Sequence, residues 1–464
     1  MDQIKKICSK YYDYIILAMV YGLLHLFIHT DYWDDVGMSA ILKSYNYNLF
    51  AYLVNTWNSW SSALILHAVE VVVEALPNYI WKTLDVMMIL ILYHYLMRVV
   101  ELLSDAVPST SSLPSARVWG LLFFLSFPFC LFATAGWMTT TIAYTWTFSL
   151  LFYSLSLFLS SSNPTASSCN AHPIRWYTYL FYELAVLYCA NCNLVSFSLA
   201  FILLVVYFNC KTKTKTFRIL FWEGMFGSVL NIIMFLVCPG NRVRNIEDAR
   251  YHDTAELLEM SFGSHLRMGI NSTFYHFVSV PNIILFTFCL LLAACVFFKT
   301  RKASVRLCAC IPLALDTFWT GYLFLRYTLP NRTLTYIYPD ALFQVCPEAE
   351  QYFIMASAFV MVLLMCYFLA YLTSFSYLSW MLLASILVLG LFPCVALGFT
   401  TTVSASVMRV ASFFYFSIIL CACVLIRICQ LLKNKLWKYV FYILGFLGSL
   451  FNIMQVIRHI IVYG

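Results

Sequence analysis

Apolar runs long enough to cross a lipid bilayer recur along almost the whole chain, and they limit the possible folds more than any other feature. Hydrophobic residues make up 62% of the sequence and charged residues 11%, so the segments between the runs are too short for a soluble core of ordinary size. A backbone surrounded by lipid must pair its own N–H and C=O groups, as a helix does. We therefore expect an all-α, polytopic integral membrane protein with a single transmembrane domain over residues 1–464.

The positions of the runs and of the basic residues predict how the chain is threaded. Lys5, Lys6 and Lys10 precede the first run, so the positive-inside rule places the amino terminus in the cytoplasm. That run continues into bulky and acidic residues in place of a small-residue cleavage site, so we expect it to be kept as an anchor. About thirteen crossings are predicted, over residues 12–29, 83–103, 117–135, 138–160, 176–190, 194–210, 217–238, 281–298, 305–325, 351–373, 376–399, 409–432 and 437–457.

Charge and motif content argue against several function classes. The net charge of +7 is spread over the predicted cytoplasmic loops, as insertion into an anionic membrane requires. It does not form one basic surface interleaved with aromatic residues, so nucleic acid is not an expected partner. The sequence has no P-loop, no Gly-x-Ser-x-Gly elbow and no His-Glu-x-x-His helix, which argues against nucleotide hydrolysis, serine-esterase chemistry and zincin proteolysis.

Polar segments at about residues 30–80, 239–280 and 327–350 would all face the outer compartment and are long enough to build a site. The first contains a stretch with helical periodicity that ends at Pro77. This amphipathic helix is expected to lie along the outer membrane surface. Its two sides carry different residues, with Leu64, Val71 and Leu76 on one and His67, Glu70 and Glu74 on the other.

Three carboxylates stand just past the first span, at Asp31, Asp34 and Asp35. In a loop, neighbouring carboxylates can share a divalent cation such as Mg²⁺ or Mn²⁺, or one can act as a base while the other orients it. We take Asp34 and Asp35 as candidate catalytic residues and, if a metal is used, as its ligands. Asp31 offers a further oxygen, and Trp33 a face for a sugar ring, although aromatic residues also belong at membrane interfaces. The alternative for the aspartates is a solvated loop that keeps negative charge outside.

Cations follow in the other outer segments. Arg242 and Arg244 come directly after a predicted span and would grip a phosphate at the headgroup level; contact with lipid headgroups is the alternative. His265 is a candidate to line the same pocket, although isolated histidines near a membrane usually form local hydrogen bonds. Arg326 is a weaker phosphate-binding candidate.

Ionisable residues also fall inside predicted spans, where a central charge costs about 2.5–3.5 kcal/mol on insertion scales. Lys82 and Asp85 are three residues apart, so we expect them to form an ion pair. Glu183, Glu223 and Asp316 would instead line a path in a transporter or flippase for a lipid-linked or anionic substrate. That activity is the alternative to an enzyme.

Several of these segments together resemble a known family. An acidic pair follows the first span, and the surface helix ends in Pro77-Asn78-Tyr79-Ile80-Trp81-Lys82. With the block Gly136-Trp137-Met138-Thr139-Thr140-Thr141 and the segment Pro239-Gly240-Asn241-Arg242, they are similar to uncharacterised bacterial membrane proteins related to GT-C glycosyltransferases. The resemblance covers about the first 280 residues, and the last two motifs are its most specific parts.

The resemblance implies a GT-C-like fold in the bacterial cytoplasmic membrane. It also implies an inverting transferase that takes a sugar from a polyprenyl-phosphate carrier and places it on a cell-surface glycan or lipid-linked acceptor at the outer face. Asp34 or Asp35 would match the family's first-loop acid. In related proteins an arginine follows the tryptophan–serine pair of the first loop, whereas Trp60-Ser61 is followed here by Ser62. This departure shifts the expected phosphate grip to Arg242 and Arg244, and Trp60 stays a substrate contact.

The chemistry of such a transfer sets two requirements. The attacking hydroxyl needs a base, and the departing phosphate needs positive charge or a metal ion. The first and second outer segments contain these two parts. A structural partner in glycan assembly, which binds glycan through its outer loops and transfers no sugar, is a third interpretation.

Overall fold

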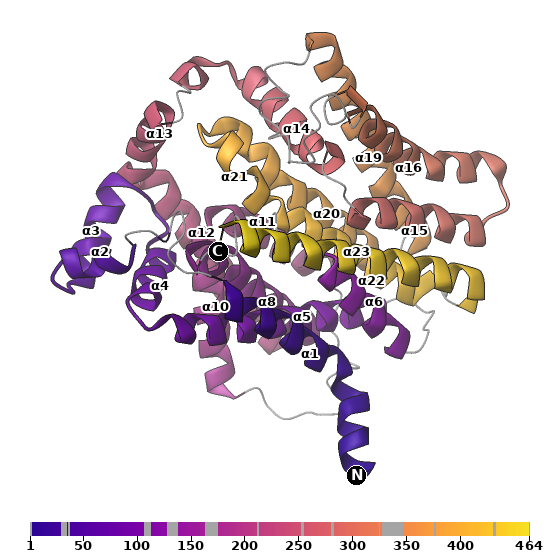
Figure 1. The fold of residues 1–464 in the computed structure, drawn as a ribbon, viewed down its shortest axis with the longest axis horizontal. Coiled ribbons are helices and arrows are strands. Elements are labelled where there is room, and N and C mark those ends of the chain that lie inside the picture. Colours follow the sequence, from indigo (N-terminus) through magenta and orange to yellow (C-terminus); the bar gives the residue numbers. More distant parts are fainter. Residues whose placement is uncertain are drawn as a thin grey trace. The chain divides into compact units, whose positions relative to one another are not determined.

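The fold is described by a computed structural model whose elements are all helical (Figure 1). No strand occurs in the part of the chain that is described, which confirms the expected all-α class. The described residues are 2–28, 35, 38–105, 113–127, 138–162, 175–210, 213–251, 255–279, 283–323, 325–326, 347–374, 377–429 and 433–463.

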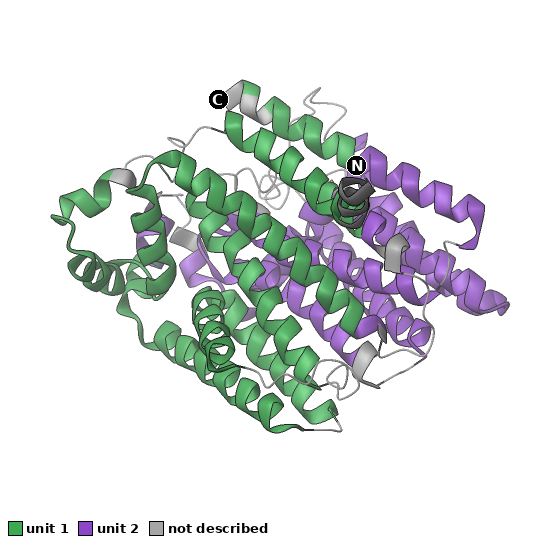
Figure 2. Ribbon diagram, turned by 90° about the horizontal axis from the view of Figure 1, so that it is seen from below, with its two compact units in different colours: residues 1–102, 120–244, 449–464 green, residues 103–119, 245–448 purple. Residues whose placement is uncertain are grey.

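The chain divides into two compact units, drawn in green and purple in Figure 2. Unit 1 comprises residues 1–102, 120–244 and 449–464, and unit 2 comprises residues 103–119 and 245–448. Four helices have residues in both units: α5 (Asn78–Asp105), α6 (Leu113–Leu125), α13 (Pro239–Tyr251) and α23 (Lys435–Tyr463). The expectation of one transmembrane domain stays a prediction.

Unit 1 contains the first long helices and the short helices of the first loop. Its elements are α1 (Asp2–Phe27), α2 (Met38–Ser44), α3 (Leu49–Ser59), α4 (Leu64–Glu74), nearly all of α5 (Asn78–Asp105), α7 (Met138–Thr140), η2 (Thr141–Trp146), α8 (Thr147–Ser162), α10 (Trp176–Asn191), α11 (Asn193–Asn209) and α12 (Lys215–Val237). Unit 2 contains η3 (Ala255–Glu259), α14 (Phe262–Ser279), α15 (Ile283–Lys299), α16 (Ala303–Leu323), α19 (Glu348–Leu372), α20 (Tyr377–Ala396), η5 (Leu397–Phe399), α21 (Val403–Val410) and α22 (Ser412–Cys429).

Several helices are long and apolar enough to cross a membrane, so the chain is a polytopic membrane protein. In the described segments there are 7 of them, or up to 8 if the bent pair Phe262–Val278 and Ile283–Lys299 is one span. The expected number of thirteen is not confirmed. Some of the other expected spans coincide with helices that are apolar but short, such as Tyr11–Phe27 and Asn193–Asn209.

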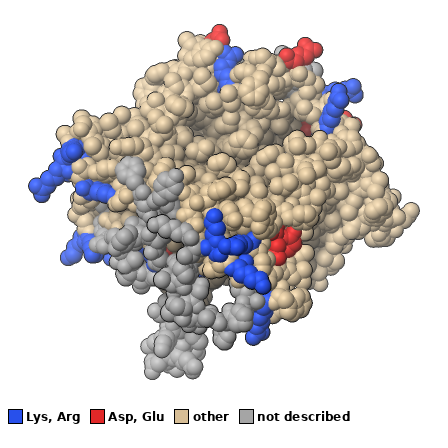
Figure 3. Space-filling model, turned by 180° about the vertical axis from the view of Figure 1, so that it is seen from behind, with Lys and Arg blue, Asp and Glu red and all other residues tan. Residues whose placement is uncertain are grey.

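The surface of these helices is also that of a membrane protein. Charged side chains are sparse on the face drawn in Figure 3, most of which is uncharged. Large apolar side chains are well exposed along single helices, for example Trp222 and Phe226 on α12 and Phe446 on α23. Soluble monomers rarely expose contiguous apolar surface on this scale, so a lipid bilayer is the expected surroundings of these helices.

The Thr-rich block begins a helix of unusual geometry. Residues Thr141–Trp146 form a π-helical turn between α7 and α8, a conformation that is rare and often found at functional sites. A cluster of buried apolar side chains holds this turn against α4, α5 and α10. The Tyr188 hydroxyl donates to the carbonyl oxygen of Ile142 at 2.9 Å, and the Trp81 indole N–H donates to the Thr141 hydroxyl at 3.0 Å.

The expected ion pair between Lys82 and Asp85 is wrong. Asp85 is fully buried and lies 2.8 Å from Nε2 of His25 on α1. Its other oxygen accepts a hydrogen bond from the indole N–H of Trp146, also at 2.8 Å. A buried carboxylate is stabilised most by donors that are themselves buried, and partners from distant helices supply these better than the neighbouring turn of α5.

Candidate functional site

Helix α4 is the element around which the candidate site in unit 1 is built. Its N-cap residue Ala63 has no side-chain oxygen, and the first N–H groups of the helix need acceptors. Asn191, at the end of α10, supplies one from a distance: its Oδ1 accepts from the backbone N–H of Ile65 at 2.9 Å and of Leu66 at 3.1 Å. Its amide group donates to Asn231 on α12 at 2.8 Å. The start of α4 is therefore fixed by two long helices.

The helix expected at this position is present, but its acidic side faces the interior of the unit. Glu70 is 2% exposed and Glu74 4% exposed. A solvated or membrane-surface helix would leave both in water. Nδ1 of His67 lies 2.7 Å from Oε2 of Glu70, so one turn of the helix supplies a partner for one acid.

Asp35, the described member of the acidic pair, binds the first turn of the helix that begins at Met138. It is 3% exposed, so the alternative of a solvated loop does not hold for it. One carboxylate oxygen accepts from the backbone N–H of Met138 at 2.9 Å, and the other from the backbone N–H of Thr139 at 3.0 Å. Asp35 thus caps a membrane-spanning helix in the way that an N-cap side chain does.

The Thr139 hydroxyl bridges two carboxyl groups. Its hydroxyl oxygen lies 2.5 Å from Oδ1 of Asp35 and 2.8 Å from Oε1 of Glu74. A hydroxyl has one hydrogen to donate, so it cannot satisfy two ionised carboxylates at once. A proton held by one of the two carboxyl groups and donated to the Thr139 oxygen would complete these contacts. The structure therefore places an acid pair with a bridging hydroxyl at the start of the Thr-rich block.

A tyrosine next to this acid pair stays protonated. Burial, together with the charges of Glu70 and Glu74, raises the pKa of Tyr52 on α3 to about 12, against an opposing hydrogen bond with Thr56. A phenol with this pKa keeps its proton throughout the physiological range. Tyr52 packs with Leu42 of α2 and Val71 of α4, so the short helices of the first loop form one apolar cluster beside the acids.

The Pro-Gly-Asn-Arg segment docks on the same first loop. A Cβ on Gly240 would lie 2.6 Å from the backbone nitrogen of Trp60 and 2.7 Å from the carbonyl oxygen of Trp57, so only glycine allows this approach. Asn241 accepts from the backbone N–H of Ser62 at 3.2 Å, and its amide group donates to the Ser62 hydroxyl at 3.3 Å. The glycine and the asparagine of this segment are therefore explained by the close contact between α13 and the end of α3.

Trp60 lies at this contact beside one of the two arginines. The guanidinium of Arg244 stacks over the Trp60 ring, 4.6 Å from its centroid, a cation–π arrangement. Arg242 is exposed on the first turn of α13. Trp60 and Arg244 are therefore brought together as one pair.

Of the other predicted site residues, two belong to unit 2 and three lie outside the described residues. In unit 2, Nδ1 of His265 donates to the carbonyl oxygen of Gly398 at 2.7 Å, and the ring stacks on Phe399. Arg326 donates to Glu350 and to the Tyr322 hydroxyl. The residues outside are Asp31, Trp33 and Asp34.

A metal site is not evident among the residues that the structure describes. No group of three or more His, Cys, Asp or Glu side chains could hold an ion there. Both oxygens of Asp35 already accept hydrogen bonds. Any role of Asp35 as a ligand for Mg²⁺ or Mn²⁺ stays a prediction.

The residues proposed for a transport path are placed on different elements. Glu183 and Glu223 lie on the packed helices α10 and α12 of unit 1, and each has a buried carboxylate oxygen without a hydrogen-bond partner. Asp316 is buried on α16 of unit 2. These acids keep the transporter as the alternative function.

Sequence reasoning missed the polar residues that assemble the site. Asn191, Asn241 and Thr139 fix the loop by hydrogen bonds, and none was selected as a site residue. A signal existed for each: Asn191 interrupts an apolar stretch, and the other two lie in the most specific motifs. Glu74 was recognised as polar, but its contact with Thr139 was not foreseen.

Comparisons with known proteins add nothing to this geometry. No family model matches the chain, and no curated protein or solved structure is significantly similar to it. The relationship to GT-C glycosyltransferases therefore stays a prediction from sequence motifs.

Proposed function

We propose that this protein is a membrane glycosyltransferase that moves a sugar, with inversion, from a polyprenyl-phosphate carrier to a cell-surface glycan or similar lipid-linked acceptor. The convergence of three motifs on the first loop carries the proposal. Asp35 contacts the start of the Thr-rich block at Met138, and the Pro-Gly-Asn-Arg segment contacts the loop through Gly240 and Asn241. Motifs far apart in the sequence thus each contact the first loop, to which the resemblance assigns the acid of the transfer site.

The proposed reaction is a single displacement at the anomeric carbon. The acceptor hydroxyl attacks from the side opposite the lipid phosphate, and the bond from the carbon to the phosphate oxygen breaks, leaving its electron pair on the phosphate. A carboxylate takes the hydroxyl proton. Because both oxygens of Asp35 accept hydrogen bonds from α7, we assign the proton to its neighbour Asp34. Asp35 then acts as a positioning residue that fixes the loop.

The departing phosphate needs a cation, and the outer arginines supply it in this proposal. Arg242 is exposed on α13 and is assigned to the phosphate. Arg244 lies over the Trp60 ring and is assigned to holding that indole for stacking on the sugar. A guanidinium that meets negative charge as it develops stabilises the transition state more than the ground state.

The membrane setting of the proposal follows from the lipid donor. The carrier's chain stays in the bilayer, so the site must open near the membrane surface. We place it at the outer face of the bacterial cytoplasmic membrane, with the amino terminus in the cytoplasm and no nucleic acid partner. The support for this placement is the distribution of basic residues along the sequence.

The proposal is tested by transfer from defined donors. The full chain, purified and reconstituted in lipid nanodiscs, is incubated with a panel of synthetic polyprenyl-phosphate sugars and acceptor glycans, and products are identified by mass spectrometry. We expect Asp34→Asn to lower kcat by about 10²-fold or more, as for loss of a general base. Arg242→Gln should lower kcat/KM, whereas Arg250→Gln, an exposed arginine on the same helix, should not.

Two results would count against this assignment. Equal activity of the Arg242→Gln and Arg250→Gln variants would contradict the assignment of Arg242 to the phosphate. Full activity of Asp34→Asn would contradict the assignment of Asp34 as the base. If no donor is turned over, while vesicles containing the protein move a lipid-linked sugar and Asp316→Asn stops this movement, the chain is a transporter.

A further inference from the structure

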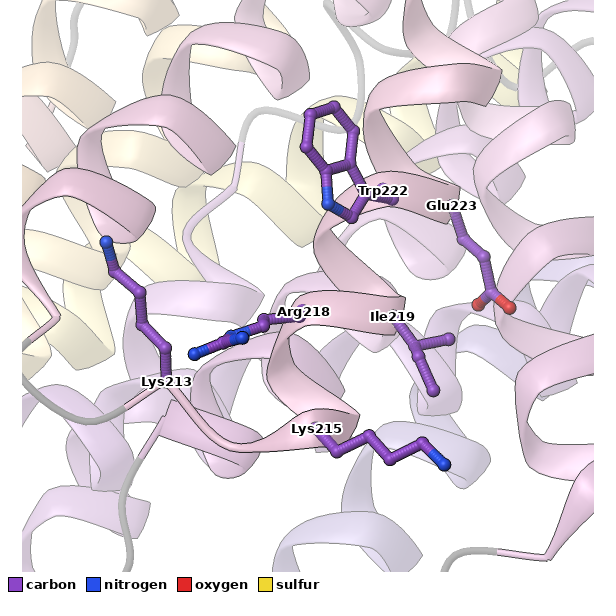
Figure 4. A pocket seen from close by; sticks show the side chains of 6 residues that line it. All are labelled: Lys213, Lys215, Arg218, Ile219, Trp222 and Glu223. Carbon is purple, nitrogen blue, oxygen red and sulfur yellow. The ribbon is translucent and has the colours of Figure 1, made fainter.

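A pocket at the start of α12 is lined by basic side chains that the proposed transfer does not use. Its volume is about 520 Å³, within the range of ligand pockets. The lining side chains, drawn in Figure 4, are Lys213, Lys215, Arg218, Ile219, Trp222 and Glu223. The lining therefore contains three cationic side chains and one carboxylate.

Within the described part of the chain, no side-chain or backbone oxygen accepts a hydrogen bond from the cationic groups of this pocket, unlike those of basic residues elsewhere. In unit 2, Lys299 donates to the carbonyl oxygens of Tyr371 and Leu372 at 2.6 and 3.0 Å, so it caps the end of α19. Lys213 lies over the Tyr207 ring at 4.1 Å. Among the described residues, no acidic side chain forms an ion pair with the three pocket cations. Their charge is thus available to a ligand.

Figure 4 shows how the charges are arranged. The side chain of Arg218 points toward Lys213, and Trp222 stands one turn further along α12. Glu223 projects on the other side of the helix, where Lys215 also extends. An anion between Lys213 and Arg218 would therefore lie away from the carboxylate. The first turn of α12 adds the favourable end of the helix dipole.

An exposed apolar stripe continues from the pocket along the same helix. Residues spaced three or four apart share one face, and from Arg218 onward that face exposes Trp222, Phe226, Val229, Ile233 and Leu236. The cationic end of this stripe suits a phosphate, and its length suits an acyl chain. A soluble anion would use the first part only, whereas a membrane lipid uses both.

From this arrangement we infer that the pocket binds the phosphate headgroup of an anionic phospholipid, whose acyl chain lies along the exposed face of α12. Basic pockets beside membrane-spanning helices bind anionic headgroups in this way. The site is independent of the proposed sugar transfer, because neither Asp34 nor the outer arginines contribute to it.

The test measures lipid binding by the delipidated full chain in detergent, using native mass spectrometry. Dioleoyl phosphatidylglycerol is titrated against dioleoyl phosphatidylcholine. The wild type should bind one phosphatidylglycerol in preference, and K213Q/K215Q/R218Q should lose roughly tenfold or more in affinity for it. K213R/K215R, which keeps the charge, should bind as the wild type does. This variant separates loss of charge from loss of folding.

The matched control is K433Q/K435Q/K438Q, which removes the same charge beside the first turn of α23. It should keep the preference for phosphatidylglycerol. Equal losses in both triple variants would mean that net charge attracts the lipid, and would overturn the proposed site. So would displacement of the lipid by glycerophosphoglycerol alone, because a soluble headgroup would then suffice without the apolar stripe.

Discussion

The hydroxyl of Thr139 faces carboxyl groups from two distant parts of the chain, 2.5 Å from Asp35 and 2.8 Å from Glu74. If one carboxyl group holds a proton, Glu74→Gln should be tolerated, because its amide can donate to the Thr139 oxygen as the acid does. Thr139→Val should lower the free energy of unfolding by about 1–3 kcal/mol, since it leaves two buried acids without their shared hydroxyl. Reversible unfolding of both variants in nanodiscs measures the difference.

The comparison of the two variants tests whether the carboxyl group of Asp35 or Glu74 holds a proton. Equal destabilisation by Glu74→Gln and Thr139→Val would contradict a proton on one of the two carboxyl groups, because the amide would then not replace the acid. This contact could not be predicted from the sequence. Helical periodicity indicates that Glu70 and Glu74 share a face, but it does not say whether that face meets water, lipid or protein.

Among the elements, α13 depends most on a single position. A Cβ on Gly240 would meet backbone atoms of Trp57, Trp60 and Ser61 at 2.6–2.9 Å, and backbone cannot move aside as a flexible side chain does. We expect Gly240→Ala to cost about 1–3 kcal/mol of stability and to separate Arg244 from Trp60. The thermal unfolding midpoint and the fluorescence of the protein, compared with a Trp60→Phe background, report these two effects.

A second glycine serves as the control for this element. Gly263, near the start of α14, has a single neighbour at 4.0 Å from the position of a Cβ. Gly263→Ala should therefore be neutral or slightly stabilising, because alanine favours a helix. If Gly240→Ala is equally harmless, the docking of α13 on the first loop is looser than described.

The sequence predicted elements better than their partners. The amphipathic pattern before Pro77 predicted a helix, and α4 (Leu64–Glu74) occupies that stretch. The pairing of Lys82 with Asp85 failed because a rule for neighbouring turns was applied to a residue whose donors, His25 and Trp146, come from other helices. In a membrane protein both the lipid-facing and the core-facing sides are apolar, so composition alone does not orient a helix.

At the scale of the whole molecule, the predicted orientation can be measured directly. The basic residues predict that the amino terminus and the connection at 300–302 lie in the cytoplasm, and the first loop outside. A fluorescent protein fused after Lys302 should therefore be bright, and alkaline phosphatase inserted at the turn 45–48 should be active. In the control, each reporter is placed at the site of the other. The opposite pattern would place Asp35 in the cytoplasm and remove the polyprenyl-phosphate donor from consideration.

The π-helical turn at Thr141–Trp146 has a consequence for how one helix addresses two partners. Residues seven apart in a regular α-helix point in nearly the same direction, with a drift of about 20°. Thr139 and Trp146 are seven apart, yet they bind the first-loop acids and Asp85 respectively. One inserted residue rotates everything beyond it by about 100°. The π-helical turn thus rotates the helix that follows it relative to the residues before it. A one-residue deletion in the turn would misalign Trp146 with Asp85 if Thr139 keeps its contact with the first-loop acids, and would misalign Thr139 if Trp146 keeps its contact.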